Sequence, residues 1–335
     1  MALSNLENTA LQDFVSSYFQ QDVKFTESIQ GDAGMRCYYR VGHSDKTYVV
    51  MDCPVNYCSV SPFIKIADYL QNNGFSAPKV IAQDISQGFL ILEDFGTTSV
   101  KDCLLGDSSN SYSKRNEIYK LIIDLLLSLQ KQNIPPRLDL KQFGNELLCS
   151  ELSVFIDYYI PHTYQRKLSD DEYKEFADIW RSVLSMQIPM NDTMVLRDYH
   201  VENMMYLQSR GSINKIGLLD FQDALLGSPI YDLVSVLEDA RISVPREEAM
   251  HYVKYFANSK GLDVESVLLN YHILGAQRNA RILGIFSRKV VRDDDTTYLK
   301  YMDRVKKYLD YDLSHPKLTQ LKEWFMKLGN LNLLK

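Results

Sequence analysis

Long apolar runs are scarce in this sequence of 335 residues, and their scarcity limits what the chain can be. The most apolar stretch, residues 121–129, is interrupted by Asp124 and is too short to cross a bilayer. The first twenty residues carry Glu7 and Asp13 and lack a basic segment ahead of an apolar core, so they do not resemble a signal peptide. We therefore expect no membrane association and a location in the cytoplasm.

Paired cysteines and blocks of positive charge are also lacking. No C-x-x-C pair occurs, which argues against a structural zinc or a disulfide framework and favours reduced thiols. Lysine and arginine total 37 against 43 acidic residues, and this negative balance argues against a nucleic-acid partner. Nothing in the sequence indicates an oligomeric state. The five cysteines are Cys37, Cys53, Cys58, Cys103 and Cys149.

The first 95 residues have the pattern of a β-rich part with a leading helix. We expect that helix from about Asn5 to Gln20, and a second helix over 61–72 that Ser61 and Pro62 open. Alternating apolar residues between turn signals predict short strands. These expected strands cover residues 35–41, 47–51, 79–83 and 89–93.

From residue 96 onward the pattern is mainly helical. Expected helices cover 112–132, 146–160, 169–186 and most of the chain after residue 229, and β-like pieces cover 194–197, 203–207 and 216–219. We predict an α+β fold of two lobes, a small β-rich N-terminal lobe of residues 1–95 and a large helical C-terminal lobe of residues 96–335. Chemistry is expected at their junction, because ligand sites favour such places.

A short segment between two of the expected strands carries the strongest chemical signal. In the catalytic loop of kinases, an aspartate accepts the proton of the substrate hydroxyl, and an asparagine five residues later binds magnesium. Asp198 and Asn203 have this spacing in the run from Leu196 to Asn203. Alone, such a spacing is common and marks an ordinary turn more often than a catalytic site.

A second acid strengthens the signal. Asp220 follows the apolar run 216–219, as the aspartate of Asp-Phe-Gly does in kinases, and Gln222 stands in place of the glycine. A turn at Gly211 and Ser212 would bring Asp220 back beside Asn203. A carboxylate and an amide oxygen are the hard ligands that Mg²⁺ prefers, so the ordered set predicts a magnesium site.

These motifs resemble the aminoglycoside and choline kinase superfamily, and more narrowly the bacterial N-acetylmuramate/N-acetylglucosamine anomeric kinases. The resemblance spans nearly the whole chain and is densest in its second half. It rests on the segments Arg-Asp-Tyr-His-x-x-Asn from Arg197, Leu219 to Ala224, Tyr231 to Ser235, Glu238 to Arg241, Gln277 to Asn279, Leu283 to Phe286, Tyr308-Leu309 and His315-Pro316.

The resemblance implies a bilobal protein-kinase-like fold and transfer of the γ-phosphate of ATP to a small-molecule hydroxyl. In the narrower family, the acceptor is the anomeric 1-hydroxyl of an amino sugar, in peptidoglycan recycling. Asp198 would be the base, Asn203 and Asp220 the Mg²⁺ ligands, and Asp232 a brace for the catalytic loop. His200 would orient the loop or Asp220 by hydrogen bonding.

One departure concerns the cation that faces the phosphates. Kinases place a lysine on the third strand of the sheet, whereas Met51 stands at that place here. The charge that spreads over the transferring phosphoryl oxygens still requires a cation. The candidates are Arg36, Arg40 and Lys65, although ordinary surface charge explains any one of them equally well. Position alone places the turn from Gly31 to Gly34 over the phosphates.

The adenine and sugar sites are less marked. The resemblance places Glu93 and Phe95 in the connector whose backbone contacts adenine, although half of such runs are only strand ends. Asp223 follows the metal acid closely enough to bind a sugar hydroxyl, and Arg241 and Arg278 offer planar forks for a lactyl carboxylate. Arg281 lies on the same helical part, and the aromatic stretch 154–159 is more typical of core.

Two alternatives stay open at this point. The first is a kinase of the same fold that acts on an aminoglycoside, choline or another amino alcohol; the 22 tyrosines leave an aromatic cage for choline conceivable. The second is a pseudokinase that binds nucleotide as a regulator, and Met51 and Gln222 favour it. Asp198, Asn203 and Asp220 oppose it, because an inactive kinase does not need all three.

Overall fold

The computed structural model describes residues 8–29, 36–106 and 111–328 of the chain. The chain divides into two compact units, the first made of residues 1–115 and 203–223 and the second of residues 116–202 and 224–335. The boundary between lobes that the sequence predicts after residue 95 stays a prediction. In the structure, residues 96–115 and 203–223 pack with the β-rich part.

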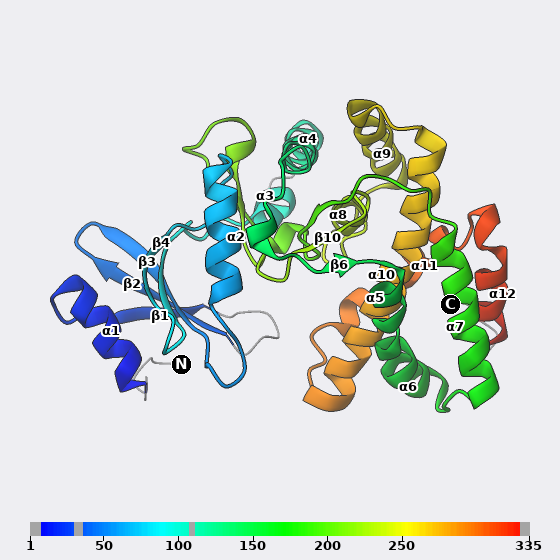
Figure 1. Ribbon diagram of the computed structural model, residues 1–335, viewed down its shortest axis with the longest axis horizontal. Coiled ribbons are helices and arrows are strands. Elements are labelled where there is room, and N and C mark those ends of the chain that lie inside the picture. Colours follow the sequence, from blue (N-terminus) through cyan, green and yellow to red (C-terminus); the bar gives the residue numbers. More distant parts are fainter. Residues whose placement is uncertain (1–7, 30–35, 107–110, 329–335) are drawn as a thin grey trace. The chain divides into compact units, whose positions relative to one another are not determined.

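A five-stranded antiparallel sheet in the order β1-β2-β3-β5-β4 is the centre of the first unit. It lies between helix α1 and helix α2 (Figure 1). Apolar side chains on one face of the sheet pack against Leu11 and Val15 of α1. The strands are β1 Phe25–Ile29, β2 Cys37–His43, β3 Lys46–Asp52, β4 Val80–Asp84 and β5 Phe89–Glu93.

The two helices of this unit follow from their caps. Helix α1 (Thr9–Phe19) begins after Asn8, whose side chain accepts a hydrogen bond from Leu11 N, so it starts later than the expected Asn5. Helix α2 (Ser61–Asn72) has the predicted bounds, with Pro62 in its first turn. Phe63 of α2 stacks on Phe221 with ring centroids 5.0 Å apart.

Two features of this unit differ from the expectations. Strand β1 was not predicted, because its sequence Phe-Thr-Glu-Ser-Ile is mostly polar and forms an edge strand. Cys53 and Cys58 form a disulfide, so the expectation that all cysteines are reduced is wrong for these two. The pair has no C-x-x-C spacing and sits in a turn that brings residues five apart together. Cys37, Cys103 and Cys149 are free thiols.

Residues 203–223 add a hairpin to the first unit. Strands β8 (Met204–Tyr206) and β9 (Ile216–Leu218) pair antiparallel, with Met204 opposite Leu218, which confirms the hairpin expected around Gly211. Tyr206 N donates to Thr98 O, just before helix α3 (Val100–Leu105). Gly217 is needed here because a Cβ would come within 2.7 Å of the Phe95 ring.

The second unit is helical, as predicted, apart from one small sheet in the order β6-β10-β7. The strands of that sheet are β6 Gln142–Phe143, β7 Thr193–Val195 and β10 Leu225–Gly227. The helices are α4 Ser111–Leu129, which starts in the first unit, α5 Asn145–Ser150, α6 Ile160–Tyr164, α7 Asp170–Ser185, α8 Tyr231–Leu237, α9 Arg246–Lys260, α10 Val264–Asp293, α11 Leu299–Asp312 and α12 Thr319–Lys327.

The long helix expected over 146–160 is broken. Helix α5 ends at Ser150, and a π-helical turn at Phe155–Tyr159 precedes α6. Helix α10 approaches this turn so closely that a Cβ on Gly284 would lie 2.5 Å from the backbone of Phe155. Tertiary packing of this kind overrides local helix propensity.

The architecture therefore has a β-sheet N-terminal part and a helical C-terminal part, which confirms the predicted α+β fold class. Within the described ranges, no helix is both long enough and apolar enough to cross a membrane.

Candidate active site

The loop that carries Asp198 follows strand β7 in the second unit. Asp232, which is fully buried at the start of α8, accepts hydrogen bonds from the backbone N–H of Leu196 at 2.7 Å and of Arg197 at 3.0 Å. Arg197 has a left-handed backbone with φ of 69°. The two hydrogen bonds offset the strain of that conformation and confirm Asp232 as the brace of the loop.

The electrostatics of this brace depend on burial. Burial raises the pKa of Asp232 to about 7, the two backbone N–H groups oppose that rise, and the nearby Asp198 carboxylate adds to it. Asp198 itself is half-buried. The half-buried Asp198 carboxylate keeps access to solvent, whereas its fully buried neighbour Asp232 holds the backbone.

Buried side chains hold the rest of the loop in place. The side chain of His200 is only 3% exposed, and its backbone N donates to Asp198 O at 3.0 Å. Tyr199 is buried, and its hydroxyl donates to Ile122 O of helix α4 at 2.7 Å. These placements agree with an orienting role for His200, which stays a prediction.

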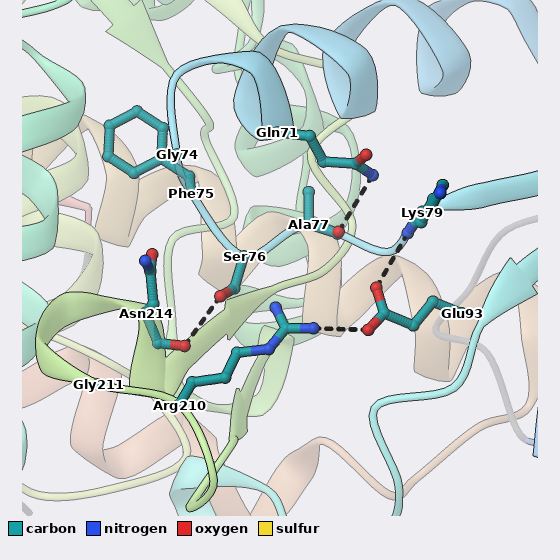
Figure 2. A pocket seen from close by; sticks show the side chains of 10 residues that line it. All are labelled: Gln71, Gly74, Phe75, Ser76, Ala77, Lys79, Glu93, Arg210, Gly211 and Asn214. Atoms are coloured by element: carbon teal, nitrogen blue, oxygen red, sulfur yellow. Dashed lines mark hydrogen bonds and ion pairs between the residues drawn. The ribbon is translucent and has the colours of Figure 1, made fainter.

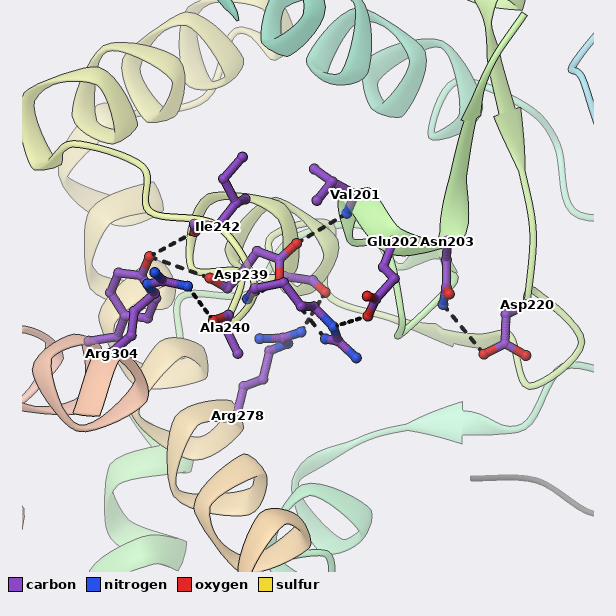
Figure 3. Close-up of polar contacts among 12 residues, drawn as sticks. Val201, Glu202, Asn203, Asp220, Asp239, Ala240, Ile242, Arg278 and Arg304 are labelled. Carbon is purple, nitrogen blue, oxygen red and sulfur yellow. Dashed lines mark hydrogen bonds and ion pairs between the residues drawn. The ribbon is translucent and has the colours of Figure 1, made fainter. Parts of the chain in front are cut away.

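Residues 201–202, between the predicted base and Asn203, are held by the turn that follows α8 (Figure 3). Asp239 accepts from Val201 N at 3.2 Å and from Arg241 N at 2.8 Å. Arg241 Nε donates to Glu202 Oε2 at 2.6 Å. Arg304 Nη1 donates to Ala240 O at 2.6 Å and so anchors the turn on α11. The sequence did not indicate this clamp.

The two arginines predicted to bind substrate lie next to this clamp. The Arg241 side chain is 11% exposed and faces Glu202. Arg278 on α10 is 3% exposed and donates from Nη2 to Ser235 Oγ at 2.8 Å, whereas its Nη1 is buried without a hydrogen-bond partner in the described chain. Both roles toward a sugar stay predictions.

The two predicted metal ligands lie together in the first unit. Leu219 N donates to Asn203 O at 2.9 Å, which closes the end of the β8–β9 hairpin. The Asn203 side-chain Nδ2 lies 3.4 Å from Asp220 Oδ2 (Figure 3). Asp220 adopts a left-handed backbone with φ of 55°. The sequence therefore predicted this proximity correctly.

The donor set around Asp220 fits a magnesium ion. Gln222 Nε2 donates to Asp220 Oδ1 at 2.7 Å and lies 3.3 Å from Asp223 Oδ2, while Gln222 Oε1 is buried without a hydrogen-bond partner in the described chain. Asn203 and Asp220 supply two hard oxygen ligands, as expected where phosphates and water complete the octahedron. No group of three or more His, Cys, Asp or Glu residues suited to a metal occurs in the described chain, so an all-protein cage is not indicated.

Tyr38 of strand β2 and Arg36, which lies just before that strand, belong to the same region. Burial raises the pKa of the Tyr38 phenol to about 12, Arg36 opposes the rise, and Asp220 and Asp223 add to it. All three charged side chains are thus within electrostatic reach of Tyr38. The sequence analysis named Arg36 but missed Tyr38.

The connector after β5 is clamped by side chains. Arg40 donates from Nε to Asp94 Oδ2 at 2.6 Å and from Nη2 to Gly96 O at 3.1 Å, and it also pairs with Glu27. Phe95 packs under the guanidinium of Arg210, 5.0 Å from its ring centroid. These contacts fix the path of the connector.

The side chain of Glu93 points away from this connector into a pocket of about 470 Å³ (Figure 2). It pairs with Arg210 at 2.5 Å and accepts from Lys79 N at 3.3 Å. The pocket is open to solvent, and all of its lining residues belong to the first unit. The predicted adenine contacts involve only the backbone of Glu93 and Phe95 and stay predictions. Gly31 and Gly34 lie outside the described residues.

Comparison with known proteins identifies the family. The model of the phosphotransferase enzyme family matches residues 27–267. The chain is 31% identical to the N-acetylmuramate/N-acetylglucosamine kinase of Caulobacter vibrioides over 97% of both chains. It is 29% identical to the enzyme of that name from Pseudomonas aeruginosa, over 89% of this chain and 86% of the relative.

Solved structures share the fold at lower sequence identity. A putative aminoglycoside phosphotransferase from Ralstonia eutropha superposes with a TM-score of 0.62 at 15% identity, over 92% of this chain and 97% of that one. A choline kinase from Streptococcus pneumoniae superposes with a TM-score of 0.59 at 14% identity, over 92% and 100%. The chain belongs to the phosphotransferase enzyme family and is a small-molecule kinase that transfers phosphate to a hydroxyl group.

Proposed function

We propose that this kinase uses ATP and Mg²⁺ to phosphorylate the anomeric 1-hydroxyl of N-acetylmuramate and N-acetylglucosamine in peptidoglycan recycling. Two observations support the chemistry. Asp232 braces the loop that carries Asp198. Asn203 and Asp220 lie next to each other at the end of one hairpin. The acceptor is supported by the curated relatives, four of which carry the name of this sugar kinase.

Asp198 is the base in this proposal. It accepts the proton of the sugar hydroxyl as that oxygen attacks the γ-phosphorus of ATP and the bond from this phosphorus to the β-phosphate breaks to release ADP. Asp232 holds the backbone just before Asp198, at Leu196 and Arg197. His200 orients the loop. Asn203 and Asp220 hold Mg²⁺, which when bound neutralises charge on the phosphates.

The nucleotide is assigned to the first unit. Glu93 and Phe95 present backbone groups to adenine, and Arg40 holds that connector through Asp94. The phosphates are assigned to Arg36; Gly31 and Gly34, predicted at the phosphates from the sequence, lie outside the described residues.

Asp223, Arg241 and Arg278 are assigned to the sugar. Asp223 is exposed, so its carboxylate is free to accept from a sugar hydroxyl. The buried Nη1 of Arg278 has no hydrogen-bond partner in the described chain and suits an acceptor such as a lactyl carboxylate or an acetamido oxygen. We also assign the protein to the cytoplasm, where ATP and recycled sugars meet.

The test is a coupled kinase assay over N-acetylmuramate, N-acetylglucosamine, glucosamine, choline and kanamycin, each with ATP and Mg²⁺. Asp198→Asn, which is nearly isosteric, is the matched control for background hydrolysis. Turnover of the two N-acetyl sugars that the control abolishes supports the proposal. If only choline or kanamycin is phosphorylated, the proposed sugar acceptor is wrong. If the protein binds nucleotide but phosphorylates none of the compounds, a regulatory role is favoured.

A further inference from the structure

The strand position where other kinases place a phosphate-facing lysine is apolar here. Met51 on β3 is fully buried, so it offers no charge to a phosphate. The transferring phosphoryl group carries negative charge that requires a fixed cation beside the metal. Another residue of the first unit must therefore supply that charge.

The register of the sheet points to strand β2. Tyr38 pairs with Met51 across the β2–β3 ladder, so their side chains share one face of the sheet. That face is opposite to the one that Tyr39, Val41 and Val50 present to α1. Arg36 precedes Tyr38 by two residues and continues the same alternation just before the strand begins.

Electrostatics place three charged side chains near the Tyr38 phenol. Burial raises the pKa of this phenol, the charge of Arg36 opposes that rise, and the charges of Asp220 and Asp223 add to it. Arg36, Asp220 and Asp223 are therefore each close enough to Tyr38 to act on it.

Arg36 is also a candidate with a guanidinium nitrogen that has no partner among the described residues. Arg40 is engaged by Asp94, Glu27 and Gly96 O, and Lys65 is exposed on α2. Arg36 Nε is buried and has no hydrogen-bond partner in the part of the chain that the structure describes. A buried donor of this kind requires an acceptor, and a bound phosphate provides one.

We propose that Arg36 replaces the missing strand lysine as the cation that binds the nucleotide phosphates. It follows the alternation of the strand face that carries Tyr38 and Met51, and its buried Nε lacks an acceptor among the described residues. This inference rests on the proposed use of ATP and not on the identity of the sugar.

The test compares the affinities of Mg²⁺–ADP and of adenosine by titration calorimetry. Arg36→Met should weaken Mg²⁺–ADP by about ten- to hundredfold, the range for a charge-assisted contact, and leave adenosine unchanged. Arg36→Lys should lose less affinity for Mg²⁺–ADP than Arg36→Met does. Lys46→Met, which removes an exposed charge from the same sheet, should bind as the wild type does.

Relocating the charge gives a second test. Arg36→Met combined with Met51→Lys should regain Mg²⁺–ADP affinity over Arg36→Met alone, even if the buried lysine lowers Tm. The proposal is overturned if Arg36→Met binds Mg²⁺–ADP within twofold of the wild type, or if Lys46→Met reproduces the loss.

The kinase assay separates this proposal from the proposed function. If the wild type binds Mg²⁺–ADP through Arg36 but turns over neither sugar, the proposed sugar acceptor is wrong and the proposed role of Arg36 is supported. If the wild type does not bind Mg²⁺–ADP, both the proposed function and the proposed role of Arg36 are wrong.

Discussion

Two residues next to short buried strands adopt left-handed backbone angles that bulky residues avoid. Arg197 precedes the predicted base, and Asp220 is a predicted metal ligand. Such conformations cost about 1–3 kcal/mol each and persist where surrounding contacts hold them. Asp232 supplies those contacts for Arg197, and Gln222 binds the side chain of Asp220. Strain at these two points aims the side chains that the proposed chemistry needs.

Replacing the base should separate chemistry from binding. Asp198→Asn should lower kcat by at least about a hundredfold, because the amide cannot accept the proton, while Mg²⁺–ADP affinity stays the same. Steady-state kinetics and calorimetry on the same preparation measure both. A variant that keeps most of the wild-type kcat would remove Asp198 from the role of base.

Replacing the metal ligands should act on magnesium. Asn203→Ala and Asp220→Asn each remove an oxygen ligand or its charge, so both should raise the Mg²⁺ concentration needed for half-maximal activity. Asp223→Asn is the matched control, since Asp223 is assigned to the sugar and should change KM for the sugar instead. An unchanged Mg²⁺ dependence in both variants would contradict the metal assignment.

At this scale the sequence indicated candidate residues better than it indicated their contacts. The spacing of Asp198 and Asn203, together with Asp220 after an apolar run, marked all three as candidates, because a catalytic loop requires fixed residue types at fixed intervals. Tyr38 carries no such signature, since a tyrosine on an alternating strand is ordinary core or surface. Its place beside Met51 follows only from the register of β2 and β3.

At the scale of secondary-structure elements, the turn after α8 matters most for the catalytic loop. It holds residues 201–202 through Asp239 and through the ion pair of Arg241 with Glu202. This segment follows the predicted base along the chain, so the turn holds the backbone on the C-terminal side of Asp198.

The ion pair predicts a measurable coupling. Arg241→Met and Glu202→Gln should each lower kcat/KM, and the double variant should lose less than the two losses added, with a coupling of about 1 kcal/mol. Arg181→Met, which removes an exposed ion pair on α7, should change nothing. Additive losses would show that Arg241 and Glu202 do not act through this ion pair.

Element boundaries show where sequence patterns suffice. Helix α2 matches its prediction because Ser61 and Pro62 signal its start. Helix α7 does so as well, because Ser169 and Glu172 form a capping box. The predicted helix over 146–160 fails, because contact with Gly284 of α10 reshapes it, and no local pattern reports a contact so distant in sequence.

At the scale of the whole molecule, buried carboxyl groups join the helices of the second unit. Glu238 and Asp312 are fully buried, and Asn279 Nδ2 donates to both, at 2.6 Å and 3.0 Å. Glu238 also faces Arg246 at 3.3 Å, and His272 Nδ1 lies 3.4 Å from Asp312. These contacts connect the turn after α8 with helices α10 and α11.

This cluster predicts a pH dependence of stability. Burial and the neighbouring Asp312 raise the pKa of Glu238 to about 8, so the folded state keeps a proton that the unfolded state releases. The free energy of unfolding should therefore fall as pH rises from about 4.5 through 8. Burial lowers the pKa of His272 to about 4, which has the opposite effect, but only below about pH 6.5.

Urea unfolding of the wild type and of Glu238→Gln between pH 6.5 and 8.5 separates the contribution of Glu238 from those of other buried carboxyl groups such as Asp232. Glu238→Gln should lose less stability over this window than the wild type. Glu247→Gln, on the first turn of α9, is the control and should follow the wild type. Equal losses in Glu238→Gln and the wild type would show that Glu238 is ionised throughout.

The fold class was predictable from the order of strands and helices along the chain. The compact units were not, because residues 203–223 leave the helical part and pack with the sheet. That arrangement depends on tertiary contacts such as Ser76 Oγ to Asn214 O at 2.8 Å, between segments 138 residues apart. Sequence periodicity carries no information on such pairs.

The central claim is phosphorylation at the anomeric carbon, and the position of the phosphate in the product tests it most directly. The product from N-acetylglucosamine is treated with borohydride, which reduces a free anomeric carbon, and is analysed by phosphorus NMR with coupling to the sugar protons. We predict a phosphate coupled to the proton on C1 and a sugar that resists reduction. A phosphate on any other carbon, with an anomeric centre that is still reducible, would contradict the account.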